Sequence, residues 1–456
     1  MCGLNYSARG KPVSTEYPPP MDTLEAARLQ MATSLGFHIV FACIGMVMPF
    51  FMIVAHYRWL KTGKQAYLDL TKAWQRGVAI FFVTGAVSGT MLSFELGLLW
   101  PGFMKHAGPI IGMPFSLEGA AFFVEAVAFG FYLYGWKKLR NKWFHWFTGL
   151  IIGVSGVASG ILVVAANGWM NAPSGFVFED GVFSQIDPVG ALMNPAWFTQ
   201  SLHMTLAAFA STGFAVAGIH AYQIWRGRKK EIHFFAFKIA LLFGSIAALL
   251  QPISGDLSAK DVAERQPVKL AAMEAHYETM EGAPIFLGGI VDEETGTVSH
   301  KLELPGLLSF LAFGDFNAKV RGLNDFPKEE HPPIGITHYA FQVMVGLGSL
   351  MMLAALIYFW SLKKTKLHDK KFFWLFFTLM APAGFLALEA GWTVTEVGRQ
   401  PWIIHGIMRT SEAVTPVPGI QVTFFMYLAI YVVLATAIWW LMQRQIRVFN
   451  QETTIS

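Results

Sequence analysis

Charged residues are scarce in this chain of 456 residues, since Asp, Glu, Lys and Arg together make up only 14% of it, against about 25% in ordinary soluble proteins. Hydrophobic residues make up 54%, which is more apolar surface than so few charges can keep in water. The composition therefore excludes a soluble multidomain enzyme. The formal net charge of +4 is also too small to indicate a nucleic-acid-binding protein.

Cysteine is almost absent as well. Cys2 and Cys43 are the two cysteines in the sequence, and two residues cannot make a disulfide framework or a cysteine-based metal site. Any bound metal or cofactor must therefore be held by other side chains, such as histidine, methionine or carboxylates.

Long apolar runs are what the chain has in abundance. About nine runs reach the roughly 20 residues that a membrane-spanning helix needs, and each is bounded by charged or Pro- and Gly-rich stretches. The first run follows a polar stretch of about 34 residues, unlike a cleavable signal peptide. We predict an all-α polytopic membrane helix bundle with spans near residues 35–55, 78–100, 118–136, 147–168, 201–224, 233–253, 337–361, 372–391 and 420–442.

Lys and Arg are distributed unevenly between the connections. They cluster after the first, third, fifth and seventh runs, as in Lys137, Lys138, Arg140 and Lys142. The segment 169–200 contains neither residue type. By the positive-inside rule the N-terminus lies outside and the C-terminus inside.

This orientation divides the chain into five segments. Residues 254–336 form one long polar connection on the outer side, and loops of this length are usually functional or disordered. The predicted organisation is an N-terminal segment, helices 1–6, the outer loop, helices 7–9 and a cytoplasmic tail, at residues 1–34, 35–253, 254–336, 337–445 and 446–456.

Ionisable and soft side chains lie near the predicted outer ends of several spans, where a charged group costs at least about 2.5–3.5 kcal/mol. They are His38, Glu95, Glu118, His203, Met344 and Glu396. A His/Met pair is an axial ligand set of low-spin haem, and His203 with Met344 on two different helices would suit it. Taken singly, Met344 also fits core packing and His203 an interhelical hydrogen bond.

Two further groups suggest chemistry. Glu118 and Glu125 are seven residues apart, so they share one helix face about 10 Å apart and could pass protons along it. The less favoured alternative is a protonated, hydrogen-bonded pair that stabilises the bundle. In the segment 389–402, Arg399 could clamp a propionate while Trp392 and Trp402 pack on a porphyrin, although an interfacial aromatic belt with an anchoring arginine is the alternative.

Together these stretches resemble subunit I of the cytochrome bd family of quinol oxidases, of the short-loop, cyanide-insensitive-like group. The resemblance covers residues 21–445 in the expected order. Its motifs are Ser93-Phe-Glu95-Leu-Gly97, Ser116-Leu-Glu118-Gly119, Lys269-Leu-Ala-Ala-Met-Glu274, Met344-Val-Gly346-Leu-Gly348 and Gly398-Arg-Gln-Pro-Trp402.

The resemblance implies roles for individual residues. His203 and Met344 would hold the iron of a low-spin haem b, while His38 and Glu396 would each hold a high-spin haem iron. Trp392 and Arg399 would contact the cofactors, with Arg399 on the propionates. Glu118 and Glu125 would deliver protons. Lys269 and Glu274 match a quinol-binding pair, although five residues on a helix turn through about 140° and would not share a face without a bend.

The resemblance also implies an activity. Quinol would be oxidised at the outer face and O2 reduced to water, which generates a proton gradient without pumping. The cofactors would be two haem b and one haem d, or haem b in place of haem d. The implied partners are a subunit II-like membrane protein and small accessory subunits, with no nucleic acid, in the bacterial cytoplasmic (inner) membrane.

The sequence departs from the family pattern at two places. Gln342 replaces an arginine commonly found two residues before the methionine ligand, which removes a positive charge near the low-spin haem. Residues 1–20 extend past the usual start, as a genuine extension or a misplaced start codon.

Three other functions are weighed against this one. A haem-copper oxidase needs an adjacent histidine pair, and the sequence has none. A secondary transporter would place its carboxylates near the bilayer midplane rather than at one face. A purely structural subunit would not need the complete set of ligands.

Overall fold

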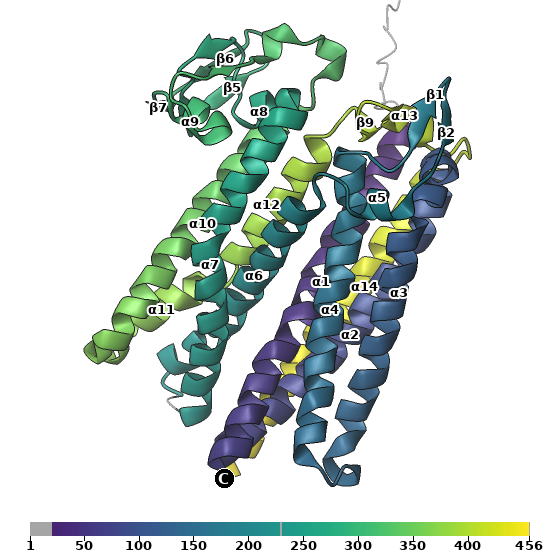
Figure 1. The fold of residues 1–456 in the computed structure, drawn as a ribbon. Coiled ribbons are helices and arrows are strands. Elements are labelled where there is room, and N and C mark those ends of the chain that lie inside the picture. Colours follow the sequence, from purple (N-terminus) through teal and green to yellow (C-terminus); the bar gives the residue numbers. More distant parts are fainter. Residues whose placement is uncertain (1–20, 229, 456) are drawn as a thin grey trace, which may run out of the picture.

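The computed structural model describes residues 21–228 and 230–455, with side chains as far as residue 448. Within these residues nine helical spans are long and apolar enough to cross a membrane, which confirms the predicted polytopic all-α bundle (Figure 1). The spans are α1 (Thr23–Thr62), α2 (Gln65–Leu99), α3 (Pro101–Lys138), α4 (Lys142–Asn171), α6 (Trp197–Trp225), α7 (Glu231–Arg265), α10 (Ile334–Lys363), α11 (Lys371–Leu379) with α12 (Ala383–Val397), and α14 (Ile420–Ile455).

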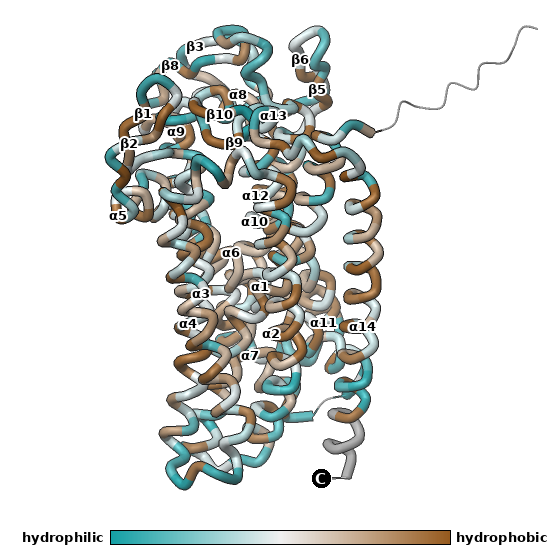
Figure 2. The backbone as a smooth tube through the Cα atoms, turned by 90° about the vertical axis from the view of Figure 1, so that its right-hand side faces the viewer, coloured by the Kyte–Doolittle hydropathy of each residue, from teal (hydrophilic) through white to brown (hydrophobic). Residues whose placement is uncertain are grey.

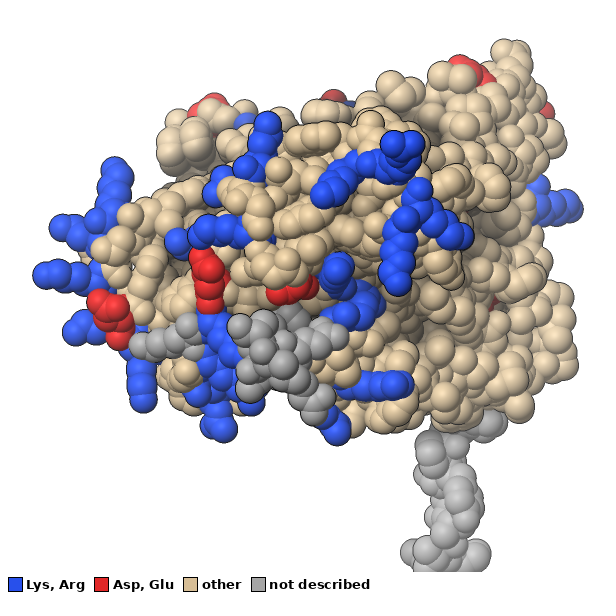
Figure 3. All heavy atoms as spheres, turned by 90° about the horizontal axis from the view of Figure 1, so that it is seen from below, with Lys and Arg blue, Asp and Glu red and all other residues tan. Residues whose placement is uncertain are grey.

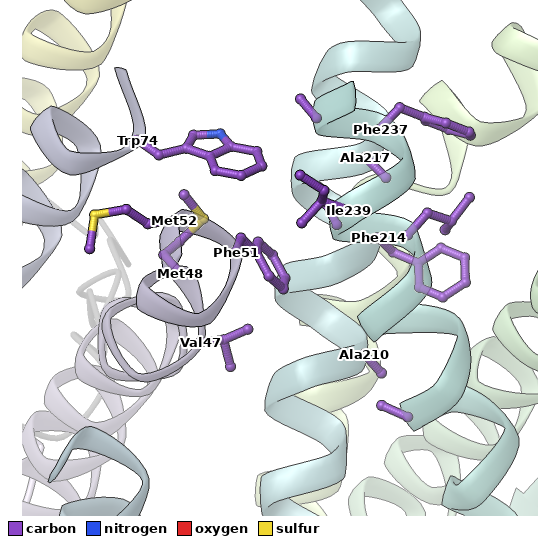
Figure 4. Packing of buried hydrophobic residues seen from close by; sticks show 14 of the residues in the cluster. Val47, Met48, Phe51, Met52, Trp74, Ala210, Phe214, Ala217, Phe237 and Ile239 are labelled. Atoms are coloured by element: carbon purple, nitrogen blue, oxygen red, sulfur yellow. The ribbon is translucent and has the colours of Figure 1, made fainter. Parts of the chain in front are cut away.

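The spans pack as two groups. Helices α1 to α4 form one group, with α14 against α1 and α2, while α6, α7, α10, α11 and α12 form the other. A continuous apolar core joins them. Phe51 of α1 lies with its ring centroid 5.3 Å from that of Phe243 on α7, and Figure 4 shows Phe51 and Trp74 pointing towards α6 and α7.

Helices α6 and α7 touch along their backbones. A Cβ atom on Gly213 would lie 2.5 Å from the Cα atom of Gly244, so neither position tolerates a side chain without a shift. Membrane helices gain van der Waals contact by such small residues because lipid offers no hydrophobic drive to associate. The close approach brings the polar residues at the outer end of α7 against α6.

The helices are longer than the apolar runs that predicted them. Helix α1 begins at Thr23 because the Asp22 side chain caps its first turn. Helix α7 continues to Arg265, into the range predicted as loop, where the ion pairs Lys260–Asp256 and Arg265–Asp261 stabilise the polar turns. The predicted span 372–391 is broken between α11 and α12, next to Pro382.

The long segment between α7 and α10, named the outer segment after its predicted location, folds over the ends of these two helices (Figure 1). It contains short helices and two-stranded antiparallel ribbons, with β3 paired to β8, β4 to β7 and β5 to β6. The elements are α8 (Pro267–Met273), β3 (Met280–Glu281), β4 (Ile285–Leu287), β5 (Ile290–Asp292), β6 (Thr297–Ser299), β7 (Leu302–Leu304), α9 (Leu307–Phe313), β8 (Lys319–Val320), η1 (Leu323–Asp325) and η2 (Lys328–Glu330).

The remaining short elements lie mostly at the same end of the bundle. The ribbon of β1 (Val177–Glu179) and β2 (Val182–Ser184), with α5 (Pro188–Leu192), follows α4. The ribbon of β9 (Trp402–Ile404) and β10 (Met408–Arg409), with α13 (Thr410–Ala413), follows α12. At the opposite end, η3 (Thr365–Asp369) joins α10 to α11.

Polarity divides the molecule along its long axis. Hydrophilic residues concentrate at both ends of the bundle in Figure 2 and apolar residues dominate the middle. The end opposite the outer segment carries many Lys and Arg and few Asp and Glu among the visible residues (Figure 3). The predicted N-terminal extension, residues 1–20, falls outside the described residues.

Candidate functional site

A large cavity of about 560 Å³ lies between α1, α2, α3, α4 and α12. This volume is in the usual range for a cofactor or ligand pocket, about 300–1,000 Å³. Six of the predicted site residues line it, namely His38, Glu118, Glu125, Trp392, Glu396 and Arg399. Residues up to 361 positions apart in the sequence, His38 and Arg399, therefore meet at one site.

His38 on α1 is held by a serine of the neighbouring helix. Its Nδ1 lies 2.9 Å from the Ser88 hydroxyl, which itself donates to the Thr84 carbonyl at 2.8 Å. When the serine proton is used there, the hydroxyl oxygen accepts from His38 Nδ1–H, and Nε2 of a neutral imidazole then carries no proton. An unprotonated Nε2 with its Nδ1–H engaged is the arrangement of a metal-ligating histidine.

Glu396 lies at the other side of the cavity, near the end of α12. The Asn167 amide of α4 donates to its Oε1, and Arg399 Nη2 lies 2.6 Å from its Oε2. Both contacts hold the Glu396 side chain in place, and a carboxylate is a ligand type that a metal accepts. Arg399 is buried, and its Nε and Nη1 atoms have no hydrogen-bond partner, so the guanidinium keeps unused donors.

The two predicted proton-carrying carboxylates share one face of α3, as their spacing requires. The Ser159 hydroxyl of α4 donates to Glu118 Oε1 at 2.9 Å. Glu125 lies seven residues further along α3 and is buried. It faces α4, since a Cβ on Gly156 would lie 3.5 Å from Glu125 Oε2. Both carboxylates border the large cavity. A proton passed between them would therefore reach this cavity.

His203 on α6 repeats the arrangement of His38. Its Nδ1 lies 3.0 Å from the Ser254 hydroxyl of α7, which donates to the Gln251 carbonyl at 3.0 Å. The Gln251 side-chain nitrogen lies 3.1 Å from Nε2 and 3.3 Å from Nδ1, so it sits against the face of the imidazole ring. The His203 imidazole is thus oriented by side chains of α7, within the second group of helices.

Met344 of α10 faces α12, since a Cβ on Gly391 would lie 3.0 Å from the methionine sulfur. Trp392, which follows Gly391 in α12, lines the large cavity. Helices α6 and α10 both pack against α12, so His203 and Met344 belong to one local group of helices. Their joint binding of a single iron stays a prediction.

The predicted quinol pair lies in and just after α8. Lys269 is buried, and its ammonium donates to the Thr395 carbonyl of α12 at 3.2 Å. Burial lowers the pKa of Lys269 to about 7, and the nearby Arg399 contributes to the shift. Glu274 is buried with Oε2 unpartnered, and burial raises its pKa to about 8. Within the described residues the two form no ion pair with each other.

Several supporting residues were missed by the sequence reasoning. Ser88, Ser254, Gln251 and Asn167 orient the predicted ligands, and the one signal for them was a polar side chain within an apolar run. Gln342, noted only as a departure, donates to the Phe286 carbonyl at 2.7 Å. It therefore ties the outer segment to α10.

Comparisons with known proteins identify the family of the chain. The family described as cytochrome bd terminal oxidase subunit I matches residues 26–449. The chain is 36% identical over 425 residues to a Bacillus subtilis protein provisionally named cytochrome bd menaquinol oxidase subunit I, covering 92% of this chain and 95% of that protein. It is 31% identical over 410 residues to cytochrome bd ubiquinol oxidase subunit 1 of the same organism, covering 87% of each.

A solved structure is similar throughout. The bd oxidase from Geobacillus thermodenitrificans superposes with a TM-score of 0.89 at 35% sequence identity, and the match covers 94% of this chain and 99% of the other. The likeness thus extends over nearly the whole chain.

Proposed function

Because the chain belongs to the cytochrome bd terminal oxidase subunit I family, a family of quinol-oxidising oxidoreductases, we propose that it is the haem-bearing subunit that oxidises quinol at its outer face and reduces O2 to water. The observation that carries the proposal is the convergence of His38, Glu396 and Arg399 on one large cavity. An imidazole, a carboxylate and unused guanidinium donors are together what an iron porphyrin with propionates requires.

The residues present fit the cofactors of such an enzyme. His38 Nε2 and Glu396 would hold two high-spin haem irons, and His203 with Met344 would hold a low-spin haem b iron. Arg399 would bind propionates and Trp392 would pack against a macrocycle. When bound, two haem b and one haem d, or haem b in its place, would supply the electron transfer and oxygen chemistry.

Glu274 is the proposed proton acceptor for quinol. Its buried carboxyl has one unpartnered oxygen, and a buried base with a pKa near the working pH is suited to accept a proton from a phenolic hydroxyl. Lys269, the second member of the implied pair, instead contacts Thr395. The site is thus proposed around Glu274 in the outer segment.

The proposed enzyme would generate a proton gradient by releasing and taking up protons on opposite faces of the membrane. Quinol protons would leave from the outer face, and Glu118 with Glu125 would bring substrate protons to the cavity from the opposite face. The gathering of Lys and Arg at the end opposite the outer segment supports an inside location for that end (Figure 3). A gradient would then form without pumping, in the bacterial cytoplasmic membrane, with a subunit II-like partner and small accessory subunits.

The test is the change Glu274→Gln in the purified membrane complex. We expect quinol-dependent oxygen uptake to fall at least about tenfold, because the amide cannot accept the proton, while haem content is unchanged. Since burial raises the pKa of Glu274 to about 8, its base form increases as the pH rises, and wild-type uptake at limiting quinol should rise with pH and level off above about 8.

The matched control is Glu278→Gln, an exposed carboxylate four residues further along the same segment. It should retain wild-type uptake and the same pH profile. Unchanged uptake in Glu274→Gln would contradict the quinol site, and loss of haem in that variant would show that Glu274 has a structural role instead.

A further inference from the structure

We propose that Lys269 and Arg399 together form a binding site for a carboxylate of a prosthetic group, and that Lys269 serves this site rather than the recognition of quinol. The inference rests on the proposed function, because it assigns the carboxylate to a haem whose ring lies in the large cavity. It departs from the role that the sequence resemblance gives to Lys269.

The first argument is where the lysine side chain goes. Helix α8 docks Lys269 onto the end of α12, where the ammonium donates to the Thr395 carbonyl at 3.2 Å. A Cβ on Gly398 would lie 3.2 Å from Lys269 Cε, so the glycine makes room for the chain. The residue is only 5% exposed. Lys269 thus points at the turn that carries Arg399.

The second argument is unbalanced positive charge. Lys269 and Arg399 are both buried, and burying a charge is costly unless it is paired. Glu396 pairs with one nitrogen of Arg399, but Nε and Nη1 of Arg399 remain without partners. An ammonium has three donors, of which one has a recorded acceptor. The site therefore has donors to spare for a further anion.

Neighbouring carboxylates do not fill this need. Glu330 reaches the same small cavity, but Arg409 Nη2 binds its Oε1 at 2.8 Å and Trp402 Nε1 binds its Oε2 at 2.8 Å. Both oxygens are therefore already engaged. His405 and Gln266 also line the cavity. Gln266 Oε1 is a buried hydrogen-bond acceptor without a partner, unlike the unpartnered donors of Arg399.

The size of the cavity decides which anion fits. Its volume is about 30 Å³, whereas a cavity that holds a benzene ring is about 150 Å³. A quinol ring is thus too large, while a carboxylate group is small enough. Arg399 and Gln400 line both this cavity and the large one. A carboxylate on a short arm could therefore enter here while its parent ring occupies the large cavity, as a haem propionate would.

Glu274 does not line the small cavity that Lys269 and Arg399 share. Helix α8 ends at Met273, and about 140° separates positions five residues apart on a helix. The two residues form no ion pair among the described contacts. They thus serve different ligands, with Glu274 left for the quinol.

The test is the pair Lys269→Met and Lys269→Arg in the purified complex, read by potentiometric titration of the high-spin haem bands and by the KM for quinol. Removing a positive charge beside a haem propionate would disfavour the reduced form of that haem. We expect Lys269→Met to lower the ratio of reduced to oxidised high-spin haem about tenfold at fixed ambient potential, equivalent to about 59 mV for one electron. Lys269→Arg should restore it, and the KM should stay within about twofold.

The control is Lys260→Met, which removes an exposed lysine paired with Asp256 on α7 and should change neither quantity. An unchanged titration with a raised KM in Lys269→Met would overturn the inference and leave the proposed function intact. Inorganic phosphate or acetate that shifts the wild-type titration as Lys269→Met does would show a free anion at the site and overturn it too. Absence of haem from the wild-type complex would instead sink the proposed function.

Discussion

His38 and His203 are held in the same way in two different groups of helices, yet their surroundings differ. Each imidazole gives its Nδ1–H to a serine whose hydroxyl donates to a backbone carbonyl of its own helix. His38 lines a cavity of about 560 Å³, whereas the Gln251 side-chain nitrogen lies 3.1 Å from Nε2 of His203. Orientation of a ligand and space for its cofactor are thus separate properties of a site.

The difference suggests how the two sites are used. An open cavity beside His38 and Glu396 leaves room for a small substrate such as O2 next to a bound iron. A histidine with a second ligand available in Met344 suits electron transfer without substrate binding. The Gln251 side chain, which lies against the His203 ring, would have to make room for a porphyrin bound there.

The largest expected effect separates the two histidines. His38→Ala should remove one high-spin haem signature and keep the low-spin one, while His203→Ala should do the reverse, because each change deletes an iron ligand. Absorption spectra of the reduced, purified variants measure both. If one variant removed both signatures, the two sites would not be independent.

A smaller effect is expected from the serines. Ser88→Ala and Ser254→Ala should each weaken retention of the neighbouring haem about 10–100-fold, since a partner that orients a ligating histidine is worth that much. Haem loss to a competing apo-globin would measure it. Thr436→Ala is the control, because Thr436 is exposed and its hydroxyl also bonds its own helix. Equal haem loss in all three variants would contradict the orienting role.

The smallest effect comes from two glycines beside the histidine rings. A Cβ on Gly89 would lie 3.0 Å from His38 Cε1, while one on Gly255 would lie 3.6 Å from His203 Cε1. Gly89→Ala should therefore displace its ring and reduce high-spin haem content a few-fold, and Gly255→Ala should change little. The gain in helix propensity, about 1 kcal/mol, is the same for both. A larger loss in Gly255→Ala would reverse the comparison.

The spans and the spacing of charged groups along them could be predicted from the sequence. Apolar runs of sufficient length predicted nine spans, and these are present in the described part of the chain. The seven-residue interval placed Glu118 and Glu125 on one helix face, and both line the cavity. Such features depend on local periodicity, which the sequence contains directly.

Contacts between distant segments could not be predicted this way. No spacing rule relates Lys269 to Thr395 or Asn167 to Glu396, because both contacts follow from how α8 and α4 pack on α12. The continuation of α7 to Arg265 was missed because its polar last turns lack an apolar run and depend on ion pairs. Lys269 and Glu274, which the resemblance gives as a quinol-binding pair, form no ion pair with each other among the described residues, and their joint role stays a prediction.

The most direct test of the account is the haem content and reduced-minus-oxidised spectrum of the purified wild-type complex, followed by the same measurement on His38→Ala. We predict three haems for each copy of this chain and a high-spin contribution that disappears in the variant. Well-folded wild-type protein without haem, or an unchanged high-spin contribution in His38→Ala, would contradict the claim that the cavity between α1 and α12 holds an iron porphyrin.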